Sequence, residues 1–278
     1  PSHAYDNLLE QGLAPETILA RYPQLKLVCP VGACYGYQNI AFDLAGNVLV
    51  DAYKKPYAEL LGEKLFTPLG MATASVGLDA LDASGDWARP HRRTKIGKAR
   101  YAFGPWRVGR VTPYYYAVPA AGGVNASILD LSLWLKAQMG YAPLTLSPAA
   151  LELMQRQRTG TPAETVRMKK VSERFEDTGY GLGWRIYRYA GQKVIAHGGT
   201  LDGYASQIAF LPDRDVGIVL LSNAQSRRFW RLLPSFLDIE LGLPRGDYLD
   251  LAPLLAGRPD GPIEDEDDEN EPEDGSSG

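Results

Sequence analysis

A tyrosine and an asparagine with one residue between them, Tyr37 and Asn39, have side chains that could take part in proton transfer. A phenol can accept or relay a proton when a cation lowers its pKa, and a carboxamide can donate hydrogen bonds to such a site and to a substrate carbonyl. The triplet stands where a loop is expected to enter a helix. Taken alone, the triplet is better explained by a packed tyrosine and a helix-capping asparagine. A functional interpretation therefore depends on the rest of the chain.

A second group, His197-Gly198-Gly199, lies far along the chain in a β-rich segment. The two glycines have no side chains, so an edge strand that contains them can pass close to a bound acyl group. The imidazole of His197 would offer a charge that switches near pH 6.5, roughly the ordinary pKa of histidine. A packed histidine with a structural role is the alternative.

Composition argues against a metalloprotein and against a membrane span. Cys29 and Cys34 do not form a CxxC pair and the three histidines are far apart, so we expect no metal site, and no cofactor is indicated. The two cysteines could form a small disulfide in an oxidising compartment, although single buried thiols are commoner, and the redox state stays open. No run of about 18 apolar residues occurs, so no integral membrane segment is expected in this chain.

Charge is distributed unevenly along the sequence. Nine of the 33 acidic residues lie in 264–274, and without them the 29 Lys and Arg outnumber the acids. Basic residues between Arg89 and Arg100 could meet an anionic surface, but no nucleic-acid-binding motif accompanies them, so we expect a solvated loop and no nucleic-acid partner. Residues 242–263 are predicted to be a linker, and 264–278 an acidic disordered tail that has almost nothing to bury.

The first half of the chain is predicted to be helical. Apolar residues at helical spacing indicate a buried helix over 40–53 and a second helix from residue 57 that ends before Pro68, which lacks the N–H needed to continue. Ser127 and Asp130 form a capping-box pattern at the start of a third helix.

The second half is predicted to be rich in strands. Residues 77–119 are expected to form a long stretch over the surface. The short apolar runs that follow, separated by Gly, Asp, Pro and Asn, indicate neighbouring antiparallel strands. Residues 226–241 should form a helix that packs across the sheet. Helices followed by a sheet imply an α+β domain over 1–241. The expected strands are Trp184–Tyr189, Lys193–Ala196, Ser206–Leu211 and Val216–Leu221.

Five segments occur in the order and spacing of a known family. They are PVGACYGYQNIAFDLAG, YAELLGEKLFTPLGM, AAGGVNASILDLSLWL, YGLGW and HGGTLDGYASQIAFLPDRDVGIVLLSN. Over about 30–223 the chain closely resembles the serine β-lactamase and penicillin-binding-protein family, in its class C β-lactamase-like or esterase-like branch. The resemblance implies a β-lactamase/transpeptidase-like α+β fold, in which an antiparallel sheet flanked by helices adjoins a helical lobe, here N-terminally incomplete.

The resemblance also implies roles for individual residues. The family's YxN motif supplies a proton-transferring tyrosine and a substrate-binding asparagine, and its KTG, HTG or HGG motif lines the opposite wall of the site on a strand. The backbone N–H after the glycines would contribute to the oxyanion hole. Residues assigned in this way are Tyr37, Asn39, His197 and Thr200 for catalysis and Gly198 and Gly199 for substrate binding.

One motif of the family is missing from this sequence. In the family a serine followed three residues later by a lysine supplies the nucleophile, N-terminal to the YxN motif, and no serine in this chain has a lysine at that position. We therefore expect a serine hydrolase that forms an acyl-enzyme with a small-molecule ester, amide or peptide, whose nucleophile segment lies outside this chain. The isolated chain is expected to be inactive and poorly stable.

A catalytically inactive domain that binds cell-wall-like peptides is the alternative to the enzyme. A serine with the expected lysine, upstream of Pro1, would decide between the two. The resemblance suggests a periplasmic or cell-surface location and is silent on oligomeric state.

Overall fold

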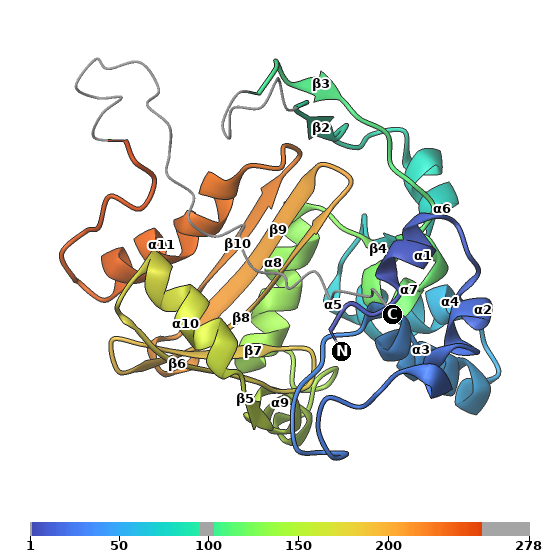
Figure 1. Cartoon of the computed structure of the whole chain (residues 1–278), viewed down its shortest axis with the longest axis horizontal. Coiled ribbons are helices and arrows are strands. Elements are labelled where there is room, and N and C mark those ends of the chain that lie inside the picture. Colours follow the sequence, from blue (N-terminus) through green and yellow to red (C-terminus); the bar gives the residue numbers. More distant parts are fainter. Residues whose placement is uncertain (1, 95–102, 252–278) are drawn as a thin grey trace, which may run out of the picture.

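A six-stranded antiparallel sheet forms the centre of the computed structural model, which describes residues 2–94 and 103–251 (Figure 1). The strand order is β10-β9-β8-β7-β6-β5, so each strand pairs with its neighbour in sequence. This is the arrangement expected where short turns join the strands. The strands are β5 Thr159–Gly160, β6 Phe175–Tyr180, β7 Arg185–Tyr189, β8 Gln192–Leu201, β9 Tyr204–Leu211 and β10 Val216–Ser222.

The four predicted strands are confirmed, but two further strands were not predicted. β6 has the sequence FEDTGY, in which Glu176, Asp177 and Gly179 disfavour a strand when judged by propensity alone. Pairing with β7 along its length stabilises it. β8 also extends beyond its predicted end and carries His197 to Leu201 within the strand.

Helices cover both faces of the sheet and give three layers (Figure 1). On one face, Leu233 and Leu237 of α11 pack in a core cluster with Phe175 of β6. On the other face, Leu135 of α8 packs with Phe210 of β9. The helices are α10 Pro162–Val171 and α11 Leu232–Glu240 on the first face, and α8 Ile128–Lys136 and α9 Pro148–Gln155 on the second.

α8 begins as the sequence predicts, whereas α11 begins later than predicted. Ser127 caps α8, because its Oγ accepts from the backbone N–H of Asp130 while the Asp130 carboxylate accepts from the N–H of Ser127. The helix predicted over 226–241 is found as a 3₁₀ turn, η6 Arg227–Arg231, followed by α11.

A helical lobe adjoins the sheet on the right of Figure 1. Its core is formed by Leu9, Ile18, Ile40 and Val118. A Cβ on Gly46 would lie only 2.9 Å from the Cβ of Ala120, so glycine at position 46 allows the helices that contain these two residues, α3 and α7, to pack closely. The lobe's elements are α1 Asp6–Glu10, α2 Pro15–Leu19, η1 Tyr22–Gln24, α3 Asn39–Tyr53, α4 Tyr57–Leu61, η2 Gly62–Phe66, α5 Thr67–Leu69, α6 Leu78–Ser84, η3 Tyr115–Ala117 and α7 Pro119–Gly122.

Two predictions about the helices of this lobe need correction. α3 is present, but it is buried only along the side of Ile40 and Gly46, and the apolar side chains of Phe42 and Val48 are exposed. The helix from Tyr57 does not end before Pro68. A π-helical turn, η2, intervenes, and Pro68 stands in the first turn of α5, where a missing N–H costs little.

In 77–94 and 103–119, the described parts of the predicted surface stretch, the chain forms only short elements, although Val118 is buried in the core of the lobe. Two residues of the predicted basic cluster contact other residues of the chain. Arg89 stacks on Trp87 with 3.6 Å from Cζ to the ring centroid, and Arg92 pairs with Asp202 at 2.5 Å. Residues 95–102 lie outside the described part. The short strands pair as β2 His91–Arg92 with β3 Arg107–Val108, and β1 Ser75–Val76 with β4 Val124–Asn125.

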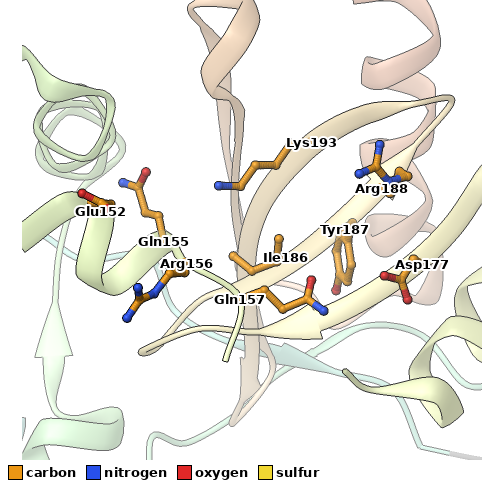
Figure 2. Close-up of a pocket in the computed structure, with 9 residues that line it drawn as sticks. All are labelled: Glu152, Gln155, Arg156, Gln157, Asp177, Ile186, Tyr187, Arg188 and Lys193. Carbon is orange, nitrogen blue, oxygen red and sulfur yellow. The ribbon is translucent and has the colours of Figure 1, made fainter. Parts of the chain in front are cut away.

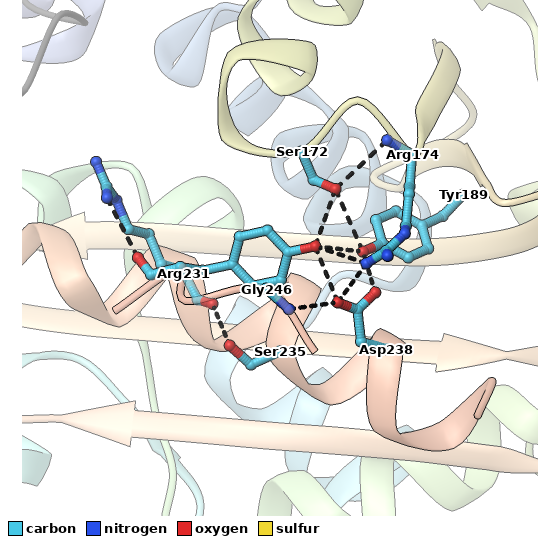
Figure 3. A network of polar contacts seen from close by, with 8 residues as sticks. Ser172, Arg174, Tyr189, Arg231, Ser235, Asp238 and Gly246 are labelled. Carbon is cyan, nitrogen blue, oxygen red and sulfur yellow. Dashed lines mark hydrogen bonds and ion pairs between the residues drawn. The ribbon is translucent and has the colours of Figure 1, made fainter. Parts of the chain in front are cut away.

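Cys29 and Cys34 are joined by a disulfide in the loop before α3, so the free-thiol alternative is wrong for this structure. Beyond α11, the described part of the predicted linker is held against the domain through Gly246 and Tyr248 (Figure 3). The predicted tail lies outside the described residues, and the domain boundaries remain a prediction. Across 2–94 and 103–251, none of the helices has the length and apolar character needed to cross a membrane.

Candidate active site

The structure brings Tyr37 and His197 together although they are far apart in sequence. Tyr37 stands in the loop that leads into α3, and His197 stands in the middle of β8. Their rings are nearly parallel, with 24° between the planes and 6.3 Å between the centroids. The helical lobe and the sheet therefore each contribute one ring to the same place.

The loop of Tyr37 is held by the beginning of the chain. The backbone N–H of Tyr37 donates to Ser2 Oγ at 3.1 Å, and its carbonyl accepts from the N–H of His3 at 2.7 Å. The rings of His3 and Tyr37 lie 5.0 Å apart. These contacts hold the backbone and the ring of Tyr37 against the beginning of the chain.

Asn39 is the first residue of α3 and does not cap it. Its Nδ2 donates to Asp6 Oδ2 at 2.9 Å, and Nδ1 of His3 lies at the same distance from that oxygen. Asp6 is buried, and its other oxygen, Oδ1, has no hydrogen-bond partner among the described residues. Asn39 is thus a member of a polar group beside Tyr37 and not a helix cap, and its substrate-binding role remains a prediction.

Tyr180 is a neighbour of His197 that the sequence analysis missed. Its hydroxyl lies 3.0 Å from His197 Nε2, within hydrogen-bonding distance, and its ring stacks on Tyr35 with 4.3 Å between centroids. Burial and the nearby Tyr37 raise the pKa of Tyr180 to about 12. The signal was present in the sequence, because Tyr180 is the first residue of the YGLGW segment.

Arg185, at the start of β7, is the second neighbour that was missed. Its Nη1 forms an ion pair with Glu164 of α10. Its Cζ lies 6.0 Å from the ring centroid of Tyr37 and 5.9 Å from that of Tyr180. Glu164 is buried and also accepts from the hydroxyl of Tyr187 at 2.9 Å. We refer below to Tyr37, Glu164, Tyr180, Arg185 and His197 as the Tyr37 cluster.

The surroundings change the proton affinities of both candidate catalytic groups. Burial, with a smaller contribution from the charge of Arg185, lowers the pKa of His197 to about 4. The predicted charge switch near pH 6.5 is therefore wrong, and the imidazole is neutral at neutral pH. Burial raises the pKa of Tyr37, the charge of Arg185 opposes this rise, and Asp6 adds to it.

The glycines after His197 differ in what surrounds them. A Cβ on Gly198 would lie 2.5 Å from Cζ3 of Trp230, so packing against that indole accounts for this glycine. A Cβ on Gly199 would meet only Ser206 Oγ, at 3.7 Å. Thr200 is exposed, opposite Ala205 of β9. The substrate-binding roles of the glycines and the oxyanion role of Thr200 remain predictions.

A pocket of ≈ 370 Å³ lies elsewhere, between α9 and the strands β6 to β8 (Figure 2). Ile186 forms part of its lining, and the charged side chains around it carry both signs. It contains none of the predicted site residues. The charged residues that line it are Glu152, Arg156, Asp177, Arg188 and Lys193. In the part of the chain that the structure describes, no three His, Cys, Asp or Glu side chains are placed to hold a metal ion.

Two curated proteins are similar to most of this chain. The unguisins hydrolase of Aspergillus campestris is 26% identical over 202 residues, which cover 70% of this chain and 34% of that protein. A D-aminopeptidase of Cereibacter sphaeroides is 23% identical over 205 residues, which cover 71% of this chain and 33% of that protein. The chain thus spans about a third of the length of these relatives.

Solved structures confirm the predicted fold. The octameric penicillin-binding protein homologue from Pyrococcus abyssi superposes with a TM-score of 0.66 at 24% identity, over 83% of this chain and 48% of that one. The α+β, β-lactamase/transpeptidase-like architecture predicted from the sequence is therefore correct. Residues 1–235, more than half of the chain, also match a family model whose description is Beta-lactamase, so this chain belongs to the β-lactamase family.

Proposed function

We propose that the chain forms most of the active site of a serine hydrolase that works through an acyl-enzyme. The observation that carries the proposal is the meeting of Tyr37, from the loop before α3, with His197, from β8, at 6.3 Å between ring centroids. Both belong to motifs that line the site in the resembling family. Relatives named as hydrolases support the same general activity.

The proposed chemistry has two symmetrical halves. In the first half, the phenolate of Tyr37 accepts the proton of the serine hydroxyl while the serine oxygen bonds to the substrate carbonyl carbon. The proton then passes from Tyr37 to the leaving group as the bond between the carbonyl carbon and the leaving group breaks. In the second half, water loses a proton to the phenolate and attacks the acyl carbon. Tyr37 then returns that proton to the serine oxygen as the acyl–serine bond breaks, which releases the acid and regenerates the serine. In this proposal Asn39 holds the substrate carbonyl or the proton network, since a carboxamide can donate to both.

We also propose that the nucleophilic serine is supplied by a segment outside this chain. One buried oxygen atom beside Tyr37, Oδ1 of Asp6, has no hydrogen-bond partner among the described residues. Buried polar atoms are normally paired, so this oxygen supports a further donor at this place. A lysine ammonium three residues after the serine would be such a donor and would also favour the phenolate of Tyr37.

The neutral state of His197 bears on the substrate class. Because its pKa is about 4, the imidazole presents no positive charge from β8 at neutral pH. We therefore propose substrates whose group next to β8 is uncharged, such as an ester or an internal amide of a peptide, over substrates that need a carboxylate bound there. The Cys29–Cys34 disulfide supports a periplasmic or cell-surface location, since disulfides persist mainly in oxidising compartments.

Replacement of the proposed base tests the function. In the full-length protein, Tyr37→Phe should lower kcat for ester or peptide hydrolysis by about two to four orders of magnitude, the usual effect of losing a positioned acid–base group. The melting temperature should change little. Tyr53→Phe, at the exposed end of α3, is the matched control and should leave kcat unchanged. Turnover by Tyr37→Phe at the control rate would remove Tyr37 from the mechanism.

A further inference from the structure

The Tyr37 cluster contains a cation that the motif resemblance does not assign. We propose that Arg185, fixed by Glu164 against the rings of Tyr37 and Tyr180, is a positioning residue that favours the phenolate of Tyr37 and the neutral imidazole of His197. The part about Tyr37 rests on the proposed function, whereas the part about His197 does not.

The position of Arg185 is well defined by its contacts. Its side chain is only 23% exposed, and its ion-pair partner Glu164 is 8% exposed. The guanidinium carbon, Cζ, lies close to both phenol rings, at 6.0 Å from the centroid of Tyr37 and 5.9 Å from that of Tyr180. Such distances place a cation in range of the negative face of an aromatic ring. Tyr180 in turn contacts His197 through its hydroxyl.

The charge of Arg185 acts on the candidate catalytic groups in one direction. A nearby positive charge stabilises a phenolate and destabilises an imidazolium, so it lowers the pKa of both groups. Both effects are present here, since Arg185 opposes the rise in the pKa of Tyr37 and contributes to the fall in that of His197. A guanidinium stays protonated throughout the pH range of catalysis, so this bias is constant.

Other charged and titratable groups face the same two rings and set how large the effect is. Glu164 opposes Arg185 at His197, which is expected of its negative charge. Asp6 opposes it at Tyr37. The negative charges of Glu164 and Asp6 therefore cancel part of the effect of Arg185 on the pKa values of His197 and Tyr37. Among the described residues, the titratable and charged groups that interact with the two rings include His3, Asp6, Tyr35, Tyr115, Glu164, Tyr180 and Arg185.

The titration of His197 tests the proposal without any turnover. The chain has only three histidines, so imidazole signals in a ¹³C-histidine-labelled protein can be assigned with His3→Gln and His91→Gln. In Arg185→Met, the pKa of His197 should rise by about one unit, the effect of removing one partly buried charge. In Arg185→Lys, which keeps the charge, less than half of this rise should remain. The His91 signal, from a residue that contacts Asn223, is the internal reference.

Two further variants separate a charge effect from a structural one. Arg188→Met removes an exposed arginine from the same strand and should leave the His197 titration unchanged. Glu164→Gln removes the opposing charge and should lower the pKa of His197, and it carries the test if Arg185→Met does not fold. An unchanged His197 titration in folded Arg185→Met, or a rise in Glu164→Gln, would overturn the proposal.

The pH profile of the full-length enzyme tests the effect on Tyr37. Arg185→Met should lower kcat at neutral pH about tenfold with little change in KM, and should move the alkaline rise of kcat to higher pH. Arg185→Lys should restore most of both. A tenfold loss that the lysine does not restore, with no shift of the profile, would contradict a charge effect on Tyr37. An inactive Tyr37→Phe with normal pH profiles in both arginine variants would leave the proposed function intact and refute the role of Arg185.

Discussion

The sheet carries two clusters built from the same residue types at opposite ends of β6 and β7. One is the Tyr37 cluster, with Arg185 and Glu164. The other, here named the Asp238 cluster, consists of Ser172, Arg174, Tyr189, Asp238 and Tyr248 (Figure 3). Each combines an arginine, a buried carboxylate and tyrosine hydroxyls.

The polar atoms of the Asp238 cluster satisfy one another. Asp238 is fully buried and accepts from Arg174 Nη1 at 2.5 Å, from the hydroxyl of Tyr189 at 2.6 Å and from that of Tyr248 at 2.9 Å. The backbone N–H of Gly246 donates to the same carboxylate. These bonds fasten the segment after α11 to β6 and β7, and they lower the pKa of Asp238 against the opposing effect of burial.

The surroundings of the Tyr37 cluster are incomplete by the same standard. Oδ1 of Asp6, beside Tyr37, has no hydrogen-bond partner among the described residues, and the pKa of His197 is lowered to about 4. Closed networks stabilise a fold, whereas buried groups with strongly shifted pKa values and unmade hydrogen bonds are typical of sites that bind or react. The comparison predicts that changes at one end affect mainly stability and changes at the other mainly activity.

The largest effect on stability is expected from Asp238→Ala. Removing the carboxylate leaves Arg174 and two phenols without their acceptor, so the free energy of unfolding should fall by about 3 kcal/mol, the lower end of the range for breaking a buried pair because Arg174 is partly exposed. Urea denaturation measures it. Glu240→Ala, on the exposed side of the same helix, should change stability by less than about 0.5 kcal/mol. A loss for Asp238→Ala no larger than that of the control would break the comparison.

The next effect is a pH dependence that distinguishes the two ends. Because the pKa of His197 falls from 6.5 unfolded to about 4 folded, the unfolded chain binds an extra proton between these values, and this residue makes stability rise with pH in that window by about 3 kcal/mol. The lowered pKa of Asp238 acts only below about pH 4, where its contribution is lost as the carboxylate is protonated.

The unfolding free energies of the wild type and of His197→Gln should therefore be measured from pH 4 to 8. Above pH 6.5 the two should depend on pH with the same slope, and below pH 6.5 the wild type should lose stability more steeply as the pH falls. Subtracting the two curves removes the titration of all other groups. Parallel curves over the whole range would show that His197 is not buried in its neutral form.

Smaller effects, one on activity and one on stability, are expected from Tyr180 and Tyr189, the last residues of β6 and β7. Tyr180→Phe removes the hydroxyl beside His197 Nε2 and should lower kcat/KM of the full-length enzyme about tenfold, with a small change in stability. Tyr189→Phe removes a donor to Asp238 and should lower stability by about 1 kcal/mol while kcat/KM stays unchanged. Equal effects of the two variants on activity would mean that the division between the two clusters is wrong.

The sequence was most informative where a local pattern coincides with a tertiary requirement. The capping box of Ser127 and Asp130 and the short apolar runs of β9 and β10 each follow from a few neighbouring residues. Strand β6 and helix α10 were missed, because their own residues are polar or poor strand formers and their stability comes from packing against β7 and Tyr187.

By itself, then, the sequence determined the family, the fold class and the two motif residues that meet, Tyr37 and His197. Motif residues can be identified from order and spacing because those survive in the chain itself. Only the tertiary structure decided what surrounds them: Arg185 and Glu164, the burial that keeps His197 neutral, and the indole that accounts for Gly198. Ion pairs between distant segments, burial and the field of a charge depend on distances in space, and no local pattern in the sequence records them.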